Sequence, residues 1–174
     1  MKGVTKIIII FCAFFFIQCK EKSTKSEEFI NTKFKGNGVE YSIEFPDTVL
    51  RGKKYKGEIH YTNVLDTITE SMINDSTSKR NRYIIFSMAL TDNIDYVEKD
   101  LWKIAKDTFG AIDNHTIPFY DVKFNKSGTF FIDGVINDQG YITSDIKNEK
   151  GSYDTRIITN EFRATKKVVV IDKG

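Results

Sequence analysis

The sequence predicts an all-β fold, an antiparallel sandwich of about seven to eight strands with one short helix or irregular crossover. Three observations predict it. Apolar and polar residues alternate along most of the chain after residue 38, as in half-buried strands. Connections that carry glycine or proline separate the alternating runs. Only residues 94–109 show helical spacing instead.

The first expected strands alternate clearly. In VEYSIEF (39–45) and KYKGEIHYT (54–62), every second residue is apolar and is expected to face inward, apart from glycine 57. Pro46 and Gly52 lie between the two runs and predict a turn-bearing connection. RYIIFSMAL (82–90) is apolar on both faces, which favours a central strand of the sandwich.

The exception is the segment IDYVEKDLWKIAKDTF (94–109). Its apolar residues Val97, Leu101 and Ile104 recur at helical spacing, and Asp95 is a possible N-cap. The segment predicts a short helix or an irregular crossover between strands.

The next strand is expected in IPFYDVKF (117–124), with Tyr120, Val122 and Phe124 on one face. A hairpin is expected in GTFFIDGVINDQGYIT (128–143). Its turn is expected at residues 137–140, because Asn, Asp and Gly favour turns. The segments TRIITNEF and KKVVVID complete the strand count.

The alternation in the hairpin also predicts which side chains face inward. Phe130, Ile132 and Ile136 fall on one face, so Asp133 is expected on the opposite face, in solvent. A solvated carboxylate there has no reason to change its pKa. A buried Asp133 near a second carboxylate in a cleft would instead indicate hydrolysis.

The order of these segments, from FPDTVLRGKKYKGEIHY to the valine-rich last strand, resembles the immunoglobulin-like domains of small bacterial surface lipoproteins. The resemblance covers Val39 to Asp172 and implies an immunoglobulin-like sandwich. The chain lacks the pair of core cysteines of antibody domains, and Trp102 lies outside the expected central strands.

The first residues predict export. Lys2 and Lys6 precede an apolar run of about a dozen residues, which fits a signal peptide and is shorter than the roughly 20 residues that span a bilayer. Cys19 follows where the apolar run ends, in FFFIQCKEK, and this arrangement resembles a bacterial lipoprotein signal. The resemblance implies removal of residues 1–18 and lipidation of Cys19. The alternatives are an uncleaved transmembrane helix and an ordinary signal beside an incidental thiol.

Three regions are therefore expected: a signal peptide at 1–18, a flexible charged tether at 19–38 and the sandwich at 39–174. The alternative function for the tether is an export or sorting signal, for which Glu27 and Glu28 are the matching residues. The chain has 26 Lys and Arg and 24 Asp and Glu, and loss of the signal would leave 24 of each. This balance argues against a nucleic-acid partner. The expected location is the bacterial outer membrane or cell surface, through the lipid anchor.

Residues that could carry chemistry are few. His60 is expected on a polar strand face and His115 in a loop, and two histidines without cysteine cannot make the common zinc sets. Five aspartates could gather at one end of the sandwich and bind calcium, although turns favour aspartate anyway. They are Asp92, Asp95, Asp133, Asp138 and Asp145. We expect no catalytic residue, metal ion or cofactor.

Two basic clusters, residues 51–56 and 78–82, are expected to be solvated loops, or a grip for an anionic polysaccharide or headgroup if they meet. Thr48, Thr67 and Ser76 match a short pattern that resembles a bacterial O-glycosylation site. Together these features predict a lipid-anchored, non-catalytic binding or structural module of the bacterial envelope with a protein or polysaccharide partner. The alternatives are a carbohydrate-acting hydrolase and an accessory or inhibitor lipoprotein of a larger envelope complex.

Overall fold

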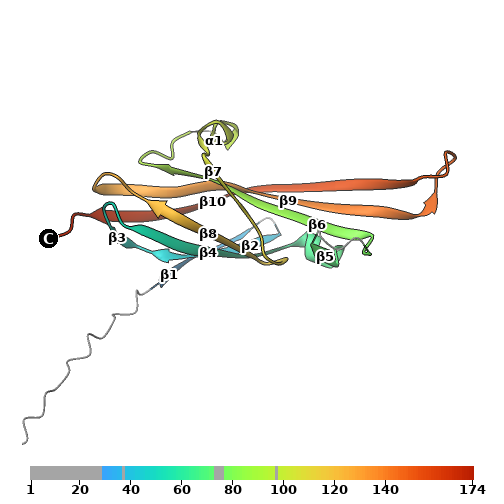
Figure 1. Ribbon diagram of the computed structural model, residues 1–174, viewed down its shortest axis with the longest axis horizontal. Coiled ribbons are helices and arrows are strands. Elements are labelled where there is room, and N and C mark those ends of the chain that lie inside the picture. The colour runs from blue at the N-terminus through green and yellow to red at the C-terminus, as the bar shows by residue number, and fades with distance from the viewer. Residues whose placement is uncertain (1–28, 37, 73–76, 97) are drawn as a thin grey trace, which may run out of the picture.

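The alternating segments form two stacked sheets (Figure 1). The computed structural model describes residues 29–36, 38–72, 77–96 and 98–174. One sheet, here called sheet A, has the strand order β1-β2-β4-β8 and is antiparallel. Its strands are β1 (Phe29–Gly36), β2 (Val39–Pro46), β4 (Lys54–Asn63) and β8 (Thr116–Lys123).

The second sheet, sheet B, has the order β3-β10-β9-β6-β5, and β7 pairs with β6. The pairs β3–β10 and β5–β6 are parallel and the other pairs are antiparallel. The predicted all-β sandwich is confirmed. It has more strands than expected, because β1 and the short strands β3, β5 and β7 were not predicted. The strands are β3 (Thr48–Leu50), β5 (Ser71–Met72), β6 (Arg80–Thr91), β7 (Asp107–Gly110), β9 (Gly128–Lys147) and β10 (Tyr153–Ile171).

Aromatic side chains join the two sheets in the core. The Phe119 ring of sheet A lies 5.8 Å from the Phe45 ring and 6.1 Å from the Phe86 ring of sheet B, measured between centroids. A Cβ atom at Gly134 would lie 2.3 Å from the Phe86 ring, so this position of β9 requires glycine. The inward faces predicted for residues 39–45 and 54–62 are confirmed by burial.

A bulge in β8 overturns one expected face. Ile117 and Phe119 are buried, but Tyr120 is 62% exposed, and the inward side resumes at Val122. The pairing of β8 with β4 shifts at this point, and Asp121 has a φ of 61°. The prediction that Tyr120 shares the face of Val122 is therefore wrong, because the bulge changes the alternation.

The outer face of sheet B is covered as well. Helix α1 (Glu98–Ile104) lies over it, as predicted for this segment, and its Leu101 is fully buried against Ala89 of β6 and Val135 of β9 (Figure 1). The expectation of a central strand at residues 82–90 is confirmed, because β6 lies between β9 and both β5 and β7 and is buried from both sides.

The hairpin turns later than expected. Strand β9 continues through residues 137–140, and the chain reverses at residues 148–152. There the side-chain oxygen of Asn148 accepts hydrogen bonds from the backbone of Lys150 and of Ser152, and Gly151 has a φ of 77°. Residues 148–152 contain Asn and Gly, the turn-favouring residues that are also present at 137–140. The predicted turn at 137–140 is therefore wrong.

The predicted tether contains a strand. β1, residues 29–36, pairs along its full length with β2 and extends sheet A by one strand. The boundary expected at residue 39 is therefore wrong, because the described domain already begins at Phe29. The signal peptide, Cys19 and the rest of the tether lie outside the described residues. Among those residues, neither helical segment is long and apolar enough to cross a bilayer.

Candidate functional site

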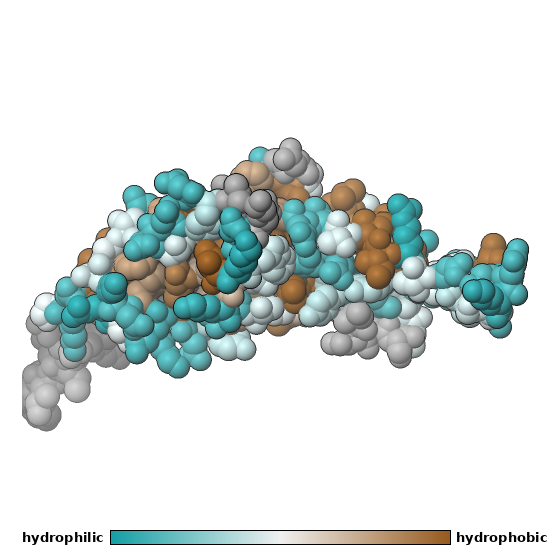
Figure 2. Space-filling view, turned by 90° about the horizontal axis from the view of Figure 1, so that it is seen from above, coloured by the Kyte–Doolittle hydropathy of each residue, from teal (hydrophilic) through white to brown (hydrophobic). Residues whose placement is uncertain are grey.

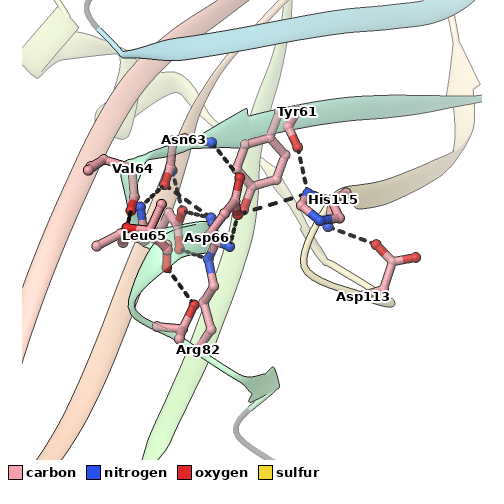
Figure 3. Close-up of polar contacts among 11 residues, drawn as sticks. Tyr61, Asn63, Val64, Leu65, Asp66, Arg82, Asp113 and His115 are labelled. Carbon is pink, nitrogen blue, oxygen red and sulfur yellow. Dashed lines mark hydrogen bonds and ion pairs between the residues drawn. The ribbon is translucent and has the colours of Figure 1, made fainter.

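A buried ion network lies between the end of β4 and the middle of sheet B (Figure 3). Arg82 of β6 is fully buried, and its Nε and Nη2 donate to the two carboxylate oxygens of Asp138 of β9 at 2.8 and 2.6 Å. Its Nη1 forms an ion pair with Asp66 of the short 3-10 helix η1 (Val64–Thr67). Buried charges of this kind are held by pairing and by hydrogen bonds.

Asn63 closes the network and also starts η1. Its side-chain oxygen accepts from the backbone N–H of Leu65 at 2.7 Å, and its own backbone N–H donates to Asp66 at 2.9 Å, which makes a capping box. Its amide nitrogen donates to Asp138 at 2.5 Å. The residues that cap the turn are thus the residues that hold the buried ion pair.

Two further side chains border the network, the buried Tyr61 and the half-exposed His115. Burial raises the pKa of the Tyr61 hydroxyl well above its usual range, and the charge of Asp138 adds to this. The Nδ1 atom of the half-exposed His115 lies 3.2 Å from the carbonyl oxygen of Tyr61 and 3.9 Å from the carboxylate of Asp66 (Figure 3).

The ion pairs and hydrogen bonds of this network suit it to stabilising the fold rather than to transferring protons in catalysis. Burial opposes the charge of Arg82, but the hydrogen bonds to Asp138 and Asp66 still raise the pKa of the guanidinium. Asp138 in turn accepts bonds from Arg82 and Asn63 at both of its oxygens. A carboxylate that is fully engaged by a permanent cation is a poor general base.

Asp133 is buried, contrary to the expectation that it lies in solvent. It is on the face opposite Ile132, as the alternation predicted, but it has no exposed surface. It accepts hydrogen bonds from Arg163 Nη2 at 2.6 Å, from the Thr165 hydroxyl at 2.6 Å and from the Tyr96 hydroxyl at 2.5 Å. The segment before α1 supplies Tyr96, so the outer face of sheet B is covered where solvent was expected.

The partners of Asp133 determine its charge state. Burial alone would raise its pKa, but the hydrogen bonds from Arg163, Thr165 and Tyr96 lower it below the usual value. The carboxylate therefore stabilises the fold above the pKa of the unfolded chain, about 4. That contribution is lost as the pH falls through the lowered pKa of the folded state. The partners identified for Asp133 are a cation and two hydroxyls, in place of the second carboxylate that hydrolysis requires.

The five aspartates considered for calcium do not meet. Asp133 and Asp138 are buried in separate ion pairs, and Asp145 lies on the outer part of β9 with Lys79 Nζ at 2.8 Å. Asp92 and Asp95 are exposed in the segment between β6 and α1. Of the aspartates that were attributed to turns, Asp133 and Asp138 thus lie in strand β9, where each neutralises an arginine.

His60 lies on the outer face of sheet A, the polar face expected for it. Its Nε2 atom lies 3.8 Å from a carboxylate oxygen of Glu44 and 3.6 Å from one of Glu58. These three side chains come from β2 and β4, and their ligand atoms all lie within 4.8 Å of one another. No spacing within one strand could reveal this group, because Glu44 joins it through the pairing of the two strands.

The two basic clusters do not meet. The first, residues 51–56, adjoins the C-terminal end of β10, where Arg51 donates its backbone N–H to Ile171. The second begins beside the far part of β9, since Arg80 lies opposite Ile142. Several of their charges pair locally, as in Arg51–Asp172, Lys54–Asp121 and Lys79–Asp145. A single anion-binding surface made from both clusters is therefore excluded.

The most distinctive surface feature is the end of the β9–β10 hairpin, here called the arm, residues 143–155. It begins where the pairing of β9 with β6 ends at Ile142 and projects beyond the sandwich (Figure 1). Figure 2 shows this narrow end as mainly hydrophilic with one small hydrophobic group exposed on it. Ile146 and Tyr153 are 79% and 49% exposed, and Ile157 at the base of the arm is 56% exposed.

The edge of β10 beside the arm is also open. Among the described strands, β3 joins this edge only at residues 169–171, so residues 153–168 have a strand partner on the β9 side alone. The ammonium groups of Lys79 and Lys147 lie 5.2 and 5.6 Å from the centre of the Tyr153 ring. The arm thus combines a cation-flanked aromatic ring with a free strand edge.

No family model matches the chain, and no curated protein matches it. The function is therefore inferred from the chemistry of the protein's surfaces.

Of the residues that resemble glycosylation sites, Thr48 and Thr67 are exposed, and Ser76 lies outside the described residues.

Proposed function

We propose that this protein is a lipid-anchored, non-catalytic binding module of the bacterial envelope that contacts a partner protein through the arm. The observation that carries the proposal is the projection of the arm past the sandwich with Ile146, Tyr153 and Ile157 exposed. An isolated two-stranded ribbon is only marginally stable in water. Exposed apolar side chains on such a ribbon become favourable when a partner covers them.

The chemistry of the arm favours a polypeptide over a polysaccharide. Tyrosine and arginine are typical residues at the centre of protein interfaces, and the arm region offers Tyr153 and the exposed Arg156. The free edge of β10 presents backbone donors and acceptors to an added strand, which is a common mode of peptide recognition. A partner strand would bury Ile157 and pair with the open edge in one step.

A non-catalytic role is supported by the use of the buried carboxylates. Asp133 and Asp138 are the two fully buried acidic residues of the described chain, and each is held by an arginine. The alternative of a carbohydrate-acting hydrolase requires a pair of carboxylates across a cleft. Glu44 and Glu58 approach each other on an exposed sheet face, and Asp66 and Asp138 are both bound to Arg82.

Serine substitutions in the arm test the proposed contact. The double variant Ile146→Ser, Tyr153→Ser is expected to reduce the amount of complex with the partner protein, recovered from cells after cross-linking, by about tenfold. The reason is that loss of central apolar contacts costs about 1–2 kcal/mol of binding. The control is Ile112→Ser, which removes an isoleucine that is 68% exposed between β7 and β8. Equal recovery of wild type and the arm variant would refute the arm as the contact.

The anchor has its own test. Lipidated Cys19 should begin the mature chain and carry the protein into the detergent phase, since each buried methylene of the acyl chains contributes about 0.8 kcal/mol. Cys19→Ala should leave an unprocessed precursor, visible by its mass. A mature wild-type protein that begins at any other residue would exclude the anchor while leaving the arm proposal intact.

A further inference from the structure

We propose that Glu44, Glu58 and His60 form a binding site for a divalent metal ion of the zinc class. The site lies on the outer face of sheet A and is independent of the arm. Strand pairing places Glu44 directly opposite Glu58, and His60 follows Glu58 by two residues on the same face. The intervening Ile43 and Ile59 are fully buried in the core, so both strands hold the three side chains on a fixed backbone.

The distances suit one small ion. In a tetrahedral zinc site with bonds of about 2.0–2.2 Å, neighbouring ligand atoms lie about 3.4 Å apart. The Nε2 atom of His60 lies 3.6 Å from Glu58 and 3.8 Å from Glu44, and all three ligand atoms fall within 4.8 Å. Small side-chain rotations bring them to bonding distance of one ion.

Electrostatics and ligand type indicate the class of ion. Glu44 and Glu58 lie directly opposite each other on neighbouring strands, so both carboxylates can bind one cation. One imidazole nitrogen with two carboxylate oxygens is a set that zinc-class ions accept, whereas calcium takes six to eight oxygen ligands. The three protein ligands leave a fourth position for water.

A hollow on the same face of sheet A adjoins His60. It has a volume of about 410 Å³ and is lined by Ser42 and His60 on the sheet and by His115 at its border. Ser42 lies directly opposite His60. An ion held by His60 would therefore lie next to an open part of the sheet face.

Zinc titration of the mature protein purified from membranes without a histidine tag tests the proposal. Calorimetry is expected to show one zinc ion per chain in wild type. His60→Ala and Glu58→Gln should each weaken binding by about tenfold or more. Glu149→Gln is the matched control for Glu58→Gln, because it neutralises an exposed glutamate outside sheet A and should leave the affinity unchanged.

NMR of the imidazole rings keeps the test decisive if a variant folds poorly. With two histidines in the chain, zinc should shift the ring signals of His60 strongly and those of His115 weakly. Absence of saturable zinc binding to wild type would overturn the site, as would equal affinity in His60→Ala. Binding of calcium in preference to zinc would overturn the proposed class of ion.

Discussion

Arg82→Met is expected to lower the free energy of unfolding by about 3–5 kcal/mol, because it leaves buried Asp138 as an uncompensated charge. Methionine fills much of the volume of the arginine stem, so the loss of charge pairing dominates over a cavity. Asp66 and Asn63 would also lose their bonds to the guanidinium, which would loosen η1. Urea denaturation followed by circular dichroism measures the change.

Two variants separate this explanation from a general packing defect. Arg80→Met, at a position whose side chain is 53% exposed, should change stability by less than about 0.5 kcal/mol. The double variant Arg82→Met, Asp138→Leu should be more stable than Arg82→Met, since it removes the orphaned charge. A double variant that is less stable than the single one would contradict the proposed role of the ion pair.

Ile132→Asp is expected to destabilise the protein by about 4 kcal/mol or more, because it places an unpaired charge in the core between the sheets. Ile132 is fully buried. The matched control is Ile146→Asp, which changes an isoleucine of the same strand that is 79% exposed and should cost little. Guanidinium denaturation of both variants gives the comparison.

Asp133→Ser, the neighbouring substitution, should also destabilise the fold, by about 1–3 kcal/mol. From the alternation alone this change was predicted to be nearly silent. The structure corrects that prediction, because Asp133 is the shared acceptor of Arg163, Thr165 and Tyr96. A silent Asp133→Ser variant would mean that this carboxylate lies in solvent after all.

Local patterns in the sequence predicted the parts of the fold that depend on neighbouring residues. The alternation in residues 39–45 and 54–62 fixed their buried faces, and the spacing of Leu101 and Ile104 indicated α1. Such patterns fail where a distant residue decides. Asn137 and Asp138 resemble turn residues, but Arg82, 56 positions away from Asp138, keeps them in a strand.

Dependence on residues that are distant in the sequence also explains why the contacts at the candidate sites could not be predicted. Arg82 was predicted in a basic cluster and at the start of the apolar run 82–90, but no local pattern indicates that Asp138 and Asp66 are its partners. Arg163 and Tyr96 meet Asp133 through strand pairing and the segment before α1, at separations of 30 and 37 residues. An aspartate inside an otherwise apolar strand is the one signal that could have suggested a buried partner cation.

The arm as the contact with a partner protein is tested most directly by photo-cross-linking in the native cells. A photoreactive amino acid is placed at Ile146 of the arm and, in a matched strain, at Ile112, both of which are well exposed. A discrete adduct of one size from position 146, absent from position 112 and lost when Tyr153 and Ile157 are changed to serine, is the result that we expect. Adducts of the same size from both positions, or no adduct from position 146, would contradict the proposal.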